Sequence, residues 1–142
     1  MASGSLRFFF YGTLLASADN PVARDIHRRL GPGRPGTARG TLHAIADPGG
    51  WYPALVPGDG EVTGMVHAAG AGFGAADLAV LDAYEGGEYR RVEIAVRCGG
   101  ERLAAQAYLY DAPLPPGARA LPDGDFAGFL SREGRRGYGS PQ

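Results

Sequence analysis

The sequence predicts a mixed α/β (α+β) fold: a small, largely antiparallel or mixed, barrel-like β-sheet with flanking helices. The first reason is composition, because 24 glycines and 11 prolines among 142 residues favour many turns over long helices. The second is that turns, rather than crossover helices, separate most of the apolar segments. A chain of this length suits a single domain with its own core, expected over residues 6–132, with flexible termini at residues 1–5 and 133–142.

The first strand is predicted from residues 8–11, which are four consecutive aromatic side chains. Such a run, without polar alternation, indicates a strand buried on both faces. The strand ends in Tyr11, Gly12, Thr13 and Leu14, where a glycine and a small hydroxyl residue interrupt the aromatic run. A glycine-containing turn after a stiff strand holds main-chain N–H groups rigidly at the mouth of a cavity. Such groups bind a carboxylate or a developing oxyanion without any basic side chain.

A helix followed by a loop is predicted next. Asp19 or Asn20 is suited to cap the helix, with Pro21 at its first position and its end near Leu30. The glycine- and proline-rich residues 31–36 are expected to form a rigid loop that ends the helix.

The middle of the chain is predicted to contain two strands. Residues 37–46 alternate as a strand, and residues 47–50 turn the chain. Residues 52–57 are bracketed by prolines, which suits an edge or a loop better than a central strand. Residues 58–60 are expected to form a further turn before residues 61–69, which alternate as a half-buried strand.

The clearest predicted helix spans residues 74–85 and ends at Gly86 and Gly87. Two strands joined by a tight hairpin at Gly99 and Gly100 follow it. These two strands are expected at residues 89–98 and 103–110. A proline-rich loop at residues 113–116 and a short helix at residues 125–131 follow them.

Glu85 lies on an unusual face of that helix for a solvated carboxylate. At about 100° per residue, apolar side chains occupy one half of the helix, and Glu85 falls between Leu78 and Leu81 within it. A carboxylate there is costly unless it is paired, hydrogen-bonded or facing a cavity, and desolvation would raise its pKa towards that of a proton acceptor at neutral pH. Two alternatives stay open: Glu85 turns out to water at the helix end, or it forms an ion pair with Arg90 or Arg91. The apolar half comprises Phe73, Leu78, Val80, Leu81 and Tyr84.

Two other carboxylates compete with Glu85. Asp82 lies just outside the apolar half of the helix, which favours a capping or surface role, and Glu88 opens a strand, where solvation is expected. Tyr108 shares a strand face with Gln106 and Tyr110, and this polar, aromatic face would suit the wall of a pocket. Cross-strand aromatic packing explains the same pattern.

Charge and composition argue against several functions. The formal net charge of −1 gives no sign of a nucleic-acid or anionic-membrane partner. Cys98 is the single cysteine, which excludes an intramolecular disulfide and disfavours a thiolate zinc site. Neither a metal nor a cofactor is expected. No apolar stretch is long enough to span a bilayer, and we expect a cytoplasmic location and a monomer or homodimer.

Residues 70–75 match the pattern G-x-G-x-x-A between a predicted strand and a predicted helix, as in a dinucleotide-binding turn. Glu93 stands near the distance expected of an acidic ribose ligand. The preceding strand alternates instead of being apolar throughout, and no series of β-α-β units follows, so this hypothesis is the weakest considered.

Several segments, in order along the chain, resemble signatures of the gamma-glutamylcyclotransferase-like family, including its AIG2-like and gamma-glutamylamine cyclotransferase branches. A weaker match covers residues 122–126, and the resemblance extends over residues 7–130. Thr13 stands where many relatives have serine, which keeps the hydroxyl. The segments are Phe10-Tyr11-Gly12-Thr13-Leu14, Tyr52-Pro53-Ala54-Leu55-Val56 with Val62-Thr63-Gly64, Leu81 through Arg91, and Tyr108-Leu109-Tyr110.

The resemblance implies the fold of that family and a cofactor-independent reaction on a small gamma-glutamyl substrate. In this reaction the α-amine of a gamma-glutamyl amide attacks its own γ-carbonyl, which releases an amine and 5-oxoproline. By resemblance, Glu85 is the general acid/base, and the turn of Tyr11, Gly12, Thr13 and Leu14 supplies main-chain donors to the glutamyl carboxylate or the oxyanion.

By the same resemblance, Tyr108 would line the pocket. The main alternative is a binding module that has the pocket and performs no chemistry.

Overall fold

The computed structural model describes residues 6–11, 24–25, 28–47, 50–85 and 87–133 of the chain. Within these residues the fold is a mixed six-stranded sheet with flanking helices, which confirms the predicted class. The elements are β1 (Arg7–Phe10), β2 (Leu30–Asp47), β3 (Gly50–Ala69), α2 (Ala75–Glu85), β4 (Tyr89–Cys98), β5 (Glu101–Tyr110), β6 (Arg119–Ala120) and α3 (Phe126–Glu133).

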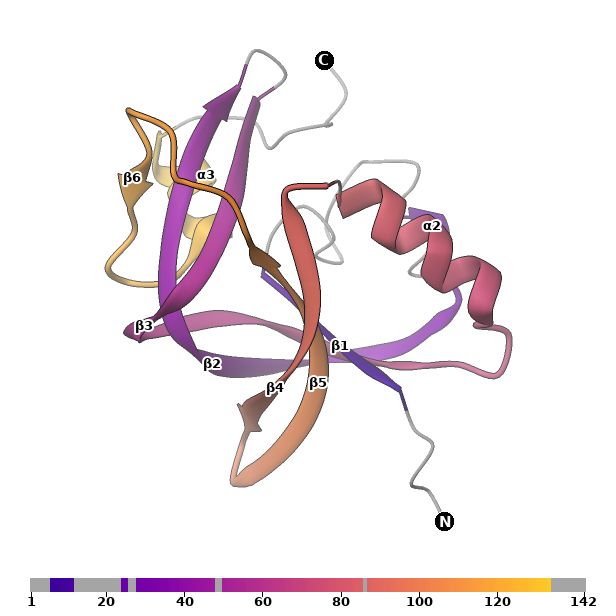
Figure 1. Ribbon diagram of the computed structural model, residues 1–142. Helices are drawn as coiled ribbons and strands as arrows, with labels where there is room; N and C mark the ends of the chain where they lie inside the picture. The colour runs from indigo at the N-terminus through magenta and orange to yellow at the C-terminus, as the bar shows by residue number, and fades with distance from the viewer. Residues whose placement is uncertain (1–5, 12–23, 26–27, 48–49, 86, 134–142) are drawn as a thin grey trace.

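The sheet closes on itself. Its strand order is β3-β1-β5-β4-β2-β6. A further pairing, between β3 and β2, closes the five strands β1, β2, β3, β4 and β5 into a ring. The pairings are antiparallel except that of β1 with β5, which is parallel. Helices α2 and α3 lie on opposite sides of this barrel-like sheet (Figure 1).

Strand β1 is buried on both faces, as predicted. Phe9 and Tyr11 belong to the core inside the ring, whereas Phe8 and Phe10 pack against Leu81 of α2. The exposed fractions of the four aromatic residues are between 0% and 5%. Full burial of one such side chain stabilises the folded state by about 1.5–3 kcal/mol. The four aromatic residues therefore contribute substantially to the stability of two separate cores.

Residues 31–36 form the beginning of strand β2, so the predicted loop is wrong. Residues 33–36 pair with β3 after a shift in register that follows Leu30, and Gly33 lies opposite His67. A Cβ on Gly33 would lie 2.7 Å from the Cε1 atom of His67, so glycine is needed for this approach. Among the described pairings, β4 joins β2 only at Thr37 and Ala38. The two prolines of residues 31–36 therefore lie where one side of the strand needs no hydrogen-bond donor.

Strand β3 runs through two segments for which a break was predicted. Residues 52–56 pair with β2 and, within the described part of the chain, with no other strand, which agrees with the expected edge position. The expected turn at 58–60 is instead part of a bulge, because the register jumps from Thr41 opposite Val56 to Arg39 opposite Glu61.

The other elements fall close to their predicted bounds, and the β4–β5 hairpin turns at Gly99 with a φ of +60°. Strand β6 is too short to produce a recognisable pattern, and it was not predicted.

Val80 is 50% exposed and does not belong to the buried face of α2, which Leu81 occupies instead. The predicted helix at 19–30 lies mostly outside the described residues, although Arg24, Asp25 and Arg28 have helical main chain.

We predict that Gly124→Ala destabilises the fold by about 2–6 kcal/mol. Gly124 has a φ of +66°, and a Cβ there would lie 1.8 Å from the carbonyl oxygen of Glu61. The loss combines about 1–3 kcal/mol for a left-handed non-glycine residue with about 1–3 kcal/mol for overpacking. Urea unfolding measures the change. Gly117→Ala is the matched control, because Gly117 has a φ of +90° and open space around it. Equal losses in the two variants would show that the contact with Glu61 contributes nothing.

Candidate active site

A polar network joins α2 to the β4–β5 hairpin. The hydroxyl of Tyr108 donates a hydrogen bond to Asp82 Oδ1 at 2.5 Å, and Arg91 Nε donates to the same oxygen at 2.9 Å. A second nitrogen of Arg91 donates to Gln106 Oε1 at 2.8 Å. The network thus connects one helix with two neighbouring strands.

The local structure explains why these side chains meet. Arg91 and Tyr108 are cross-strand partners in the β4–β5 ladder. Leu81 is fully buried between α2 and the sheet in a cluster with Tyr108, so the next residue, Asp82, lies at the border of that packed interface. The side chain of Asp82 is 42% exposed, and that of Arg91 is 29% exposed.

Sequence reasoning assigned Asp82 a capping or surface role, and the structure gives it two strand partners. The signal that could have found it is a carboxylate beside the buried stripe of a helix, with a tyrosine and an arginine at paired positions of the following hairpin. Of the two arginines named from the sequence as possible ion-pair partners of Glu85, Arg91 binds Asp82, and Arg90 Nε lies 3.5 Å from Asp111 Oδ2.

The end of β1 meets the same region from the other side. The hydroxyl of Tyr11 donates a hydrogen bond to the main-chain oxygen of Tyr108. Because β1 and β5 are parallel, with Phe8 opposite Gln106, their carboxyl ends lie at the same edge of the sheet. Tyr11 and Tyr108, two of the predicted substrate-binding residues, are therefore in direct contact. The other three, Gly12, Thr13 and Leu14, lie outside the described residues.

Glu85 is the last residue of α2. It follows the buried Leu81 by one helical turn, so its main chain lies on the stripe of the helix that faces the sheet. Its side chain is outside the described part of the structure. The catalytic role of Glu85 stays a prediction.

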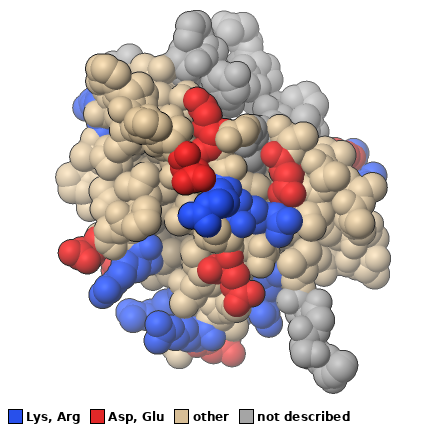
Figure 2. All heavy atoms as spheres, in the orientation of Figure 1, with Lys and Arg blue, Asp and Glu red and all other residues tan. Residues whose placement is uncertain are grey.

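One face of the molecule carries charges of both signs. Figure 2 shows arginine side chains gathered near the middle of the visible face, with acidic side chains on more than one side of them.

Burial, followed by the nearby charge of Glu88, raises the pKa of Tyr110, and a hydrogen bond with Tyr52 acts in the opposite direction. Tyr110 therefore stays protonated at neutral pH.

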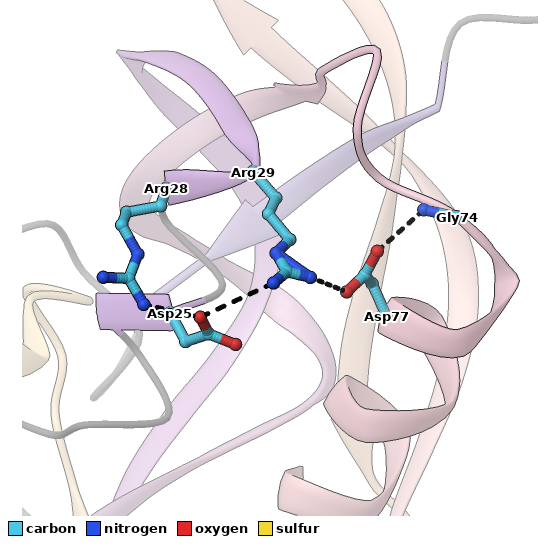
Figure 3. A network of polar contacts seen from close by, with 5 residues as sticks. All are labelled: Asp25, Arg28, Arg29, Gly74 and Asp77. Carbon is cyan, nitrogen blue, oxygen red and sulfur yellow. Dashed lines mark hydrogen bonds and ion pairs between the residues drawn. The ribbon is translucent and has the colours of Figure 1, made fainter.

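The glycine-rich turn before α2 has a structural explanation. Asp77 accepts a hydrogen bond from the main-chain N–H of Gly74 at 2.9 Å, which caps the helix, and Arg29 donates to the other oxygen of Asp77 at 2.6 Å (Figure 3). A carboxylate thus occupies the position at which a pyrophosphate would bind. Strand β3, which precedes this turn, is antiparallel to both of its neighbours, whereas the strands of a dinucleotide-binding unit have parallel neighbours.

Arg29, which binds Asp77, also lies near a second acidic residue, the exposed Asp25. Arg28 donates a hydrogen bond to Asp25, and Arg29 lies beside it (Figure 3). The Arg28 guanidinium, followed by that of Arg29, holds the pKa of Asp25 below its ordinary value.

The described residues contain no group of three or more histidine, cysteine or acidic side chains that could hold a metal ion. None of their helices is long and apolar enough to cross a membrane.

The sequence matches the family described as "Gamma-glutamyl cyclotransferase, AIG2-like" over residues 8–128. The chain belongs to this family. The match includes every residue predicted from the sequence to form the site.

Solved structures agree with this assignment at the level of the fold. An AIG2-like protein from Mus musculus has a TM-score of 0.62 and 21% identity, with 78% of this chain and 80% of that chain covered. YkqA from Bacillus subtilis has a TM-score of 0.68 and 18% identity over 92% of this chain, which spans only 42% of that protein. A structure described as a gamma-glutamyl cyclotransferase has a TM-score of 0.55 and 23% identity, with 83% of this chain and 72% of that chain covered. Among curated proteins, no significant match is found.

We predict that Tyr11→Phe lowers the free energy of unfolding by about 1–2 kcal/mol, because a buried hydrogen bond to the Tyr108 carbonyl is lost. Tyr11 is only 5% exposed. Tyr89→Phe is the comparison, since the Tyr89 hydroxyl also donates to a carbonyl oxygen, that of Pro53, but is less buried. Chemical denaturation of both variants measures the difference. A larger loss in Tyr89→Phe would contradict the importance given to the β1–β5 contact.

Proposed function

We propose that this protein is an intramolecular cyclotransferase that releases 5-oxoproline and a free amine from a small gamma-glutamyl amide. Membership of the gamma-glutamyl cyclotransferase, AIG2-like family supports this class of reaction. The observation that carries the proposal is the packing of α2 on β1 and β5 through Leu81, because Glu85 follows Leu81 by one helical turn. The main chain at the proposed base therefore lies on the helix face from which Leu81 contacts Phe10 and Tyr108.

The reaction needs a proton to be moved and two groups to be held. Glu85 takes a proton from the α-ammonium of the substrate, and the resulting amine attacks the γ-carbonyl to form a five-membered ring. The tetrahedral intermediate then collapses: the C–N bond to the leaving amine breaks while Glu85 delivers its proton to that nitrogen. The ring nitrogen loses a second proton, which the released amine takes up to leave as an ammonium ion. No proton is consumed overall, and no cofactor is required.

The turn after β1 has the positioning role in this proposal. Main-chain N–H groups of Gly12, Thr13 and Leu14 bind the glutamyl α-carboxylate or the oxyanion of the intermediate. Holding the amine close to the γ-carbonyl is itself a large part of catalysis, because intramolecular geometry replaces an encounter in solution. The contact between Tyr11 and Tyr108 supports this role, since it fixes the strand from which the turn departs.

The first experiment tests the reaction itself. The protein is incubated with a panel of gamma-glutamyl amines, gamma-glutamyl dipeptides and glutathione, and 5-oxoproline is quantified by mass spectrometry. We expect release from at least one member of the panel. Binding of a gamma-glutamyl compound by calorimetry, without turnover of any panel member, would instead support the binding module.

We predict that Glu85→Gln lowers kcat at least about 100-fold, because the amide removes the proton acceptor and keeps the shape of the side chain. KM is expected to change little. Glu93→Gln is the matched control, since Glu93 is an exposed carboxylate on β4 whose loss leaves the proposed chemistry intact. Release that survives in Glu85→Gln would reject Glu85 as the base while leaving the reaction class in place.

A further inference from the structure

We infer that Asp82 is a positioning residue: paired with Arg91, it fixes the Tyr108 hydroxyl as a hydrogen-bond acceptor for the α-ammonium of the substrate. The inference rests on the proposed function and adds to it a residue and a recognition role. The contacts that carry it join three described side chains: those of Asp82, Arg91 and Tyr108.

Tyr108 is held at both of its ends. Its main-chain oxygen accepts a hydrogen bond from the hydroxyl of Tyr11, and its own hydroxyl donates to Asp82. The residue is 4% exposed and packs with Phe10 and Leu81. The ring therefore has a single orientation relative to α2, and that orientation is set by a carboxylate of α2 itself.

The direction of the hydrogen bond determines what Tyr108 offers a ligand. An ionised carboxylate only accepts hydrogen bonds, so the single hydroxyl proton of Tyr108 is committed to Asp82. Any further hydrogen bond at that oxygen must come from a donor. In a gamma-glutamyl amide the strongest donor is the α-ammonium, which is also the group from which Glu85 takes its proton in the proposed reaction.

Arg91 keeps Asp82 in this arrangement. Its guanidinium approaches both carboxylate oxygens of Asp82, at 2.9 and 3.4 Å, and reaches Gln106 with another nitrogen. The neighbouring pair of Arg90 and Asp111 differs, because it is 3.5 Å long and both of its side chains are more than half exposed. Partly exposed ion pairs stabilise a fold only weakly, so geometry is the main consequence of the Asp82–Arg91 pair.

Asp82 also ties this arrangement to the proposed base. It precedes Glu85 by three residues in the last turn of α2, so movement of that turn alters the positions of both. The same carboxylate thereby sets the orientation of the tyrosine and the position of the helix end relative to β5.

The test compares four variants: Asp82→Ala, Asp82→Asn, Tyr108→Phe and the double variant of Asp82→Ala with Tyr108→Phe. We expect Asp82→Ala and Tyr108→Phe each to lower kcat/KM for 5-oxoproline release by about 10- to 100-fold. The double variant should lose no more than the worse single variant, because the two residues act as one unit. Asp82→Asn keeps an acceptor for the tyrosine and should recover part of the activity. The matched control Asp111→Asn, which breaks the neighbouring exposed pair, should leave kcat/KM unchanged.

Losses that multiply in the double variant would overturn the inference, as would a change in melting temperature with kcat and KM unaltered. A second arm tests the recognition role with a des-amino analogue of the preferred substrate, used as a competitive inhibitor. Tyr108→Phe should weaken substrate binding several-fold and leave the inhibition constant of the analogue unchanged. An equal loss for both compounds would exclude the α-ammonium as the group that Tyr108 binds.

A third measurement does not require activity. In protein labelled at the ζ-carbon of tyrosine, the NMR signal of Tyr108, assigned with Tyr108→Phe, should shift in Asp82→Ala and stay in place in Asp111→Asn. An unchanged signal in Asp82→Ala would show that Asp82 does not hold the hydroxyl. If the signal shifts while no gamma-glutamyl compound is turned over, the hydrogen bond exists and the proposed function, together with the recognition role, is rejected.

Discussion

The burial of β1 on both faces is the constraint on which the rest of the structure depends. This four-residue strand lies between β3 and β5 in the ring, so the sheet closes only if it is present. Phe9 and Tyr11 contribute to the inner core, while Phe8 and Phe10 form the surface on which α2 packs. A polar residue on either face would remove contacts from one of two layers. The position of the helix, and therefore of the candidate site, follows from this strand.

How far the sequence determines the fold depends on the kind of signal each segment carries. The aromatic run of β1 and the glycines at the β4–β5 hairpin are local signals, and both predictions are confirmed. Residues 31–36 were misjudged because glycine and proline are ambiguous: they mark loops, but they also suit a strand that is paired on one side and crowded on the other. The tertiary contact that decides between these, the approach of Gly33 to His67, is invisible in the sequence.

The candidate site shows the same division. Periodicity places Glu85 on the helix stripe that continues from Leu81, and alternation places Tyr108 with Gln106 on one strand face. Neither pattern reveals that Asp82 and Arg91 meet, because that contact requires the docking of α2 against the hairpin. Its position on the helix therefore predicts only a capping or surface role for Asp82. Its exposure is indeed intermediate, yet its hydrogen bonds make it the link between the two elements.

The proposed division of labour between Asp82 and Glu85 follows from the contacts of Asp82. A general base must exchange protons with the substrate, so it cannot have its oxygens committed to fixed donors throughout the reaction. Asp82 already accepts hydrogen bonds from Arg91 and Tyr108, which suits an orienting group and disfavours a proton carrier. If Asp82 orients and Glu85 transfers the proton, the helix turn that both share has to be held more firmly than propensity alone allows. The packing of Leu81 against β1 and β5 provides that restraint, so the site inherits its precision from the burial of the first strand.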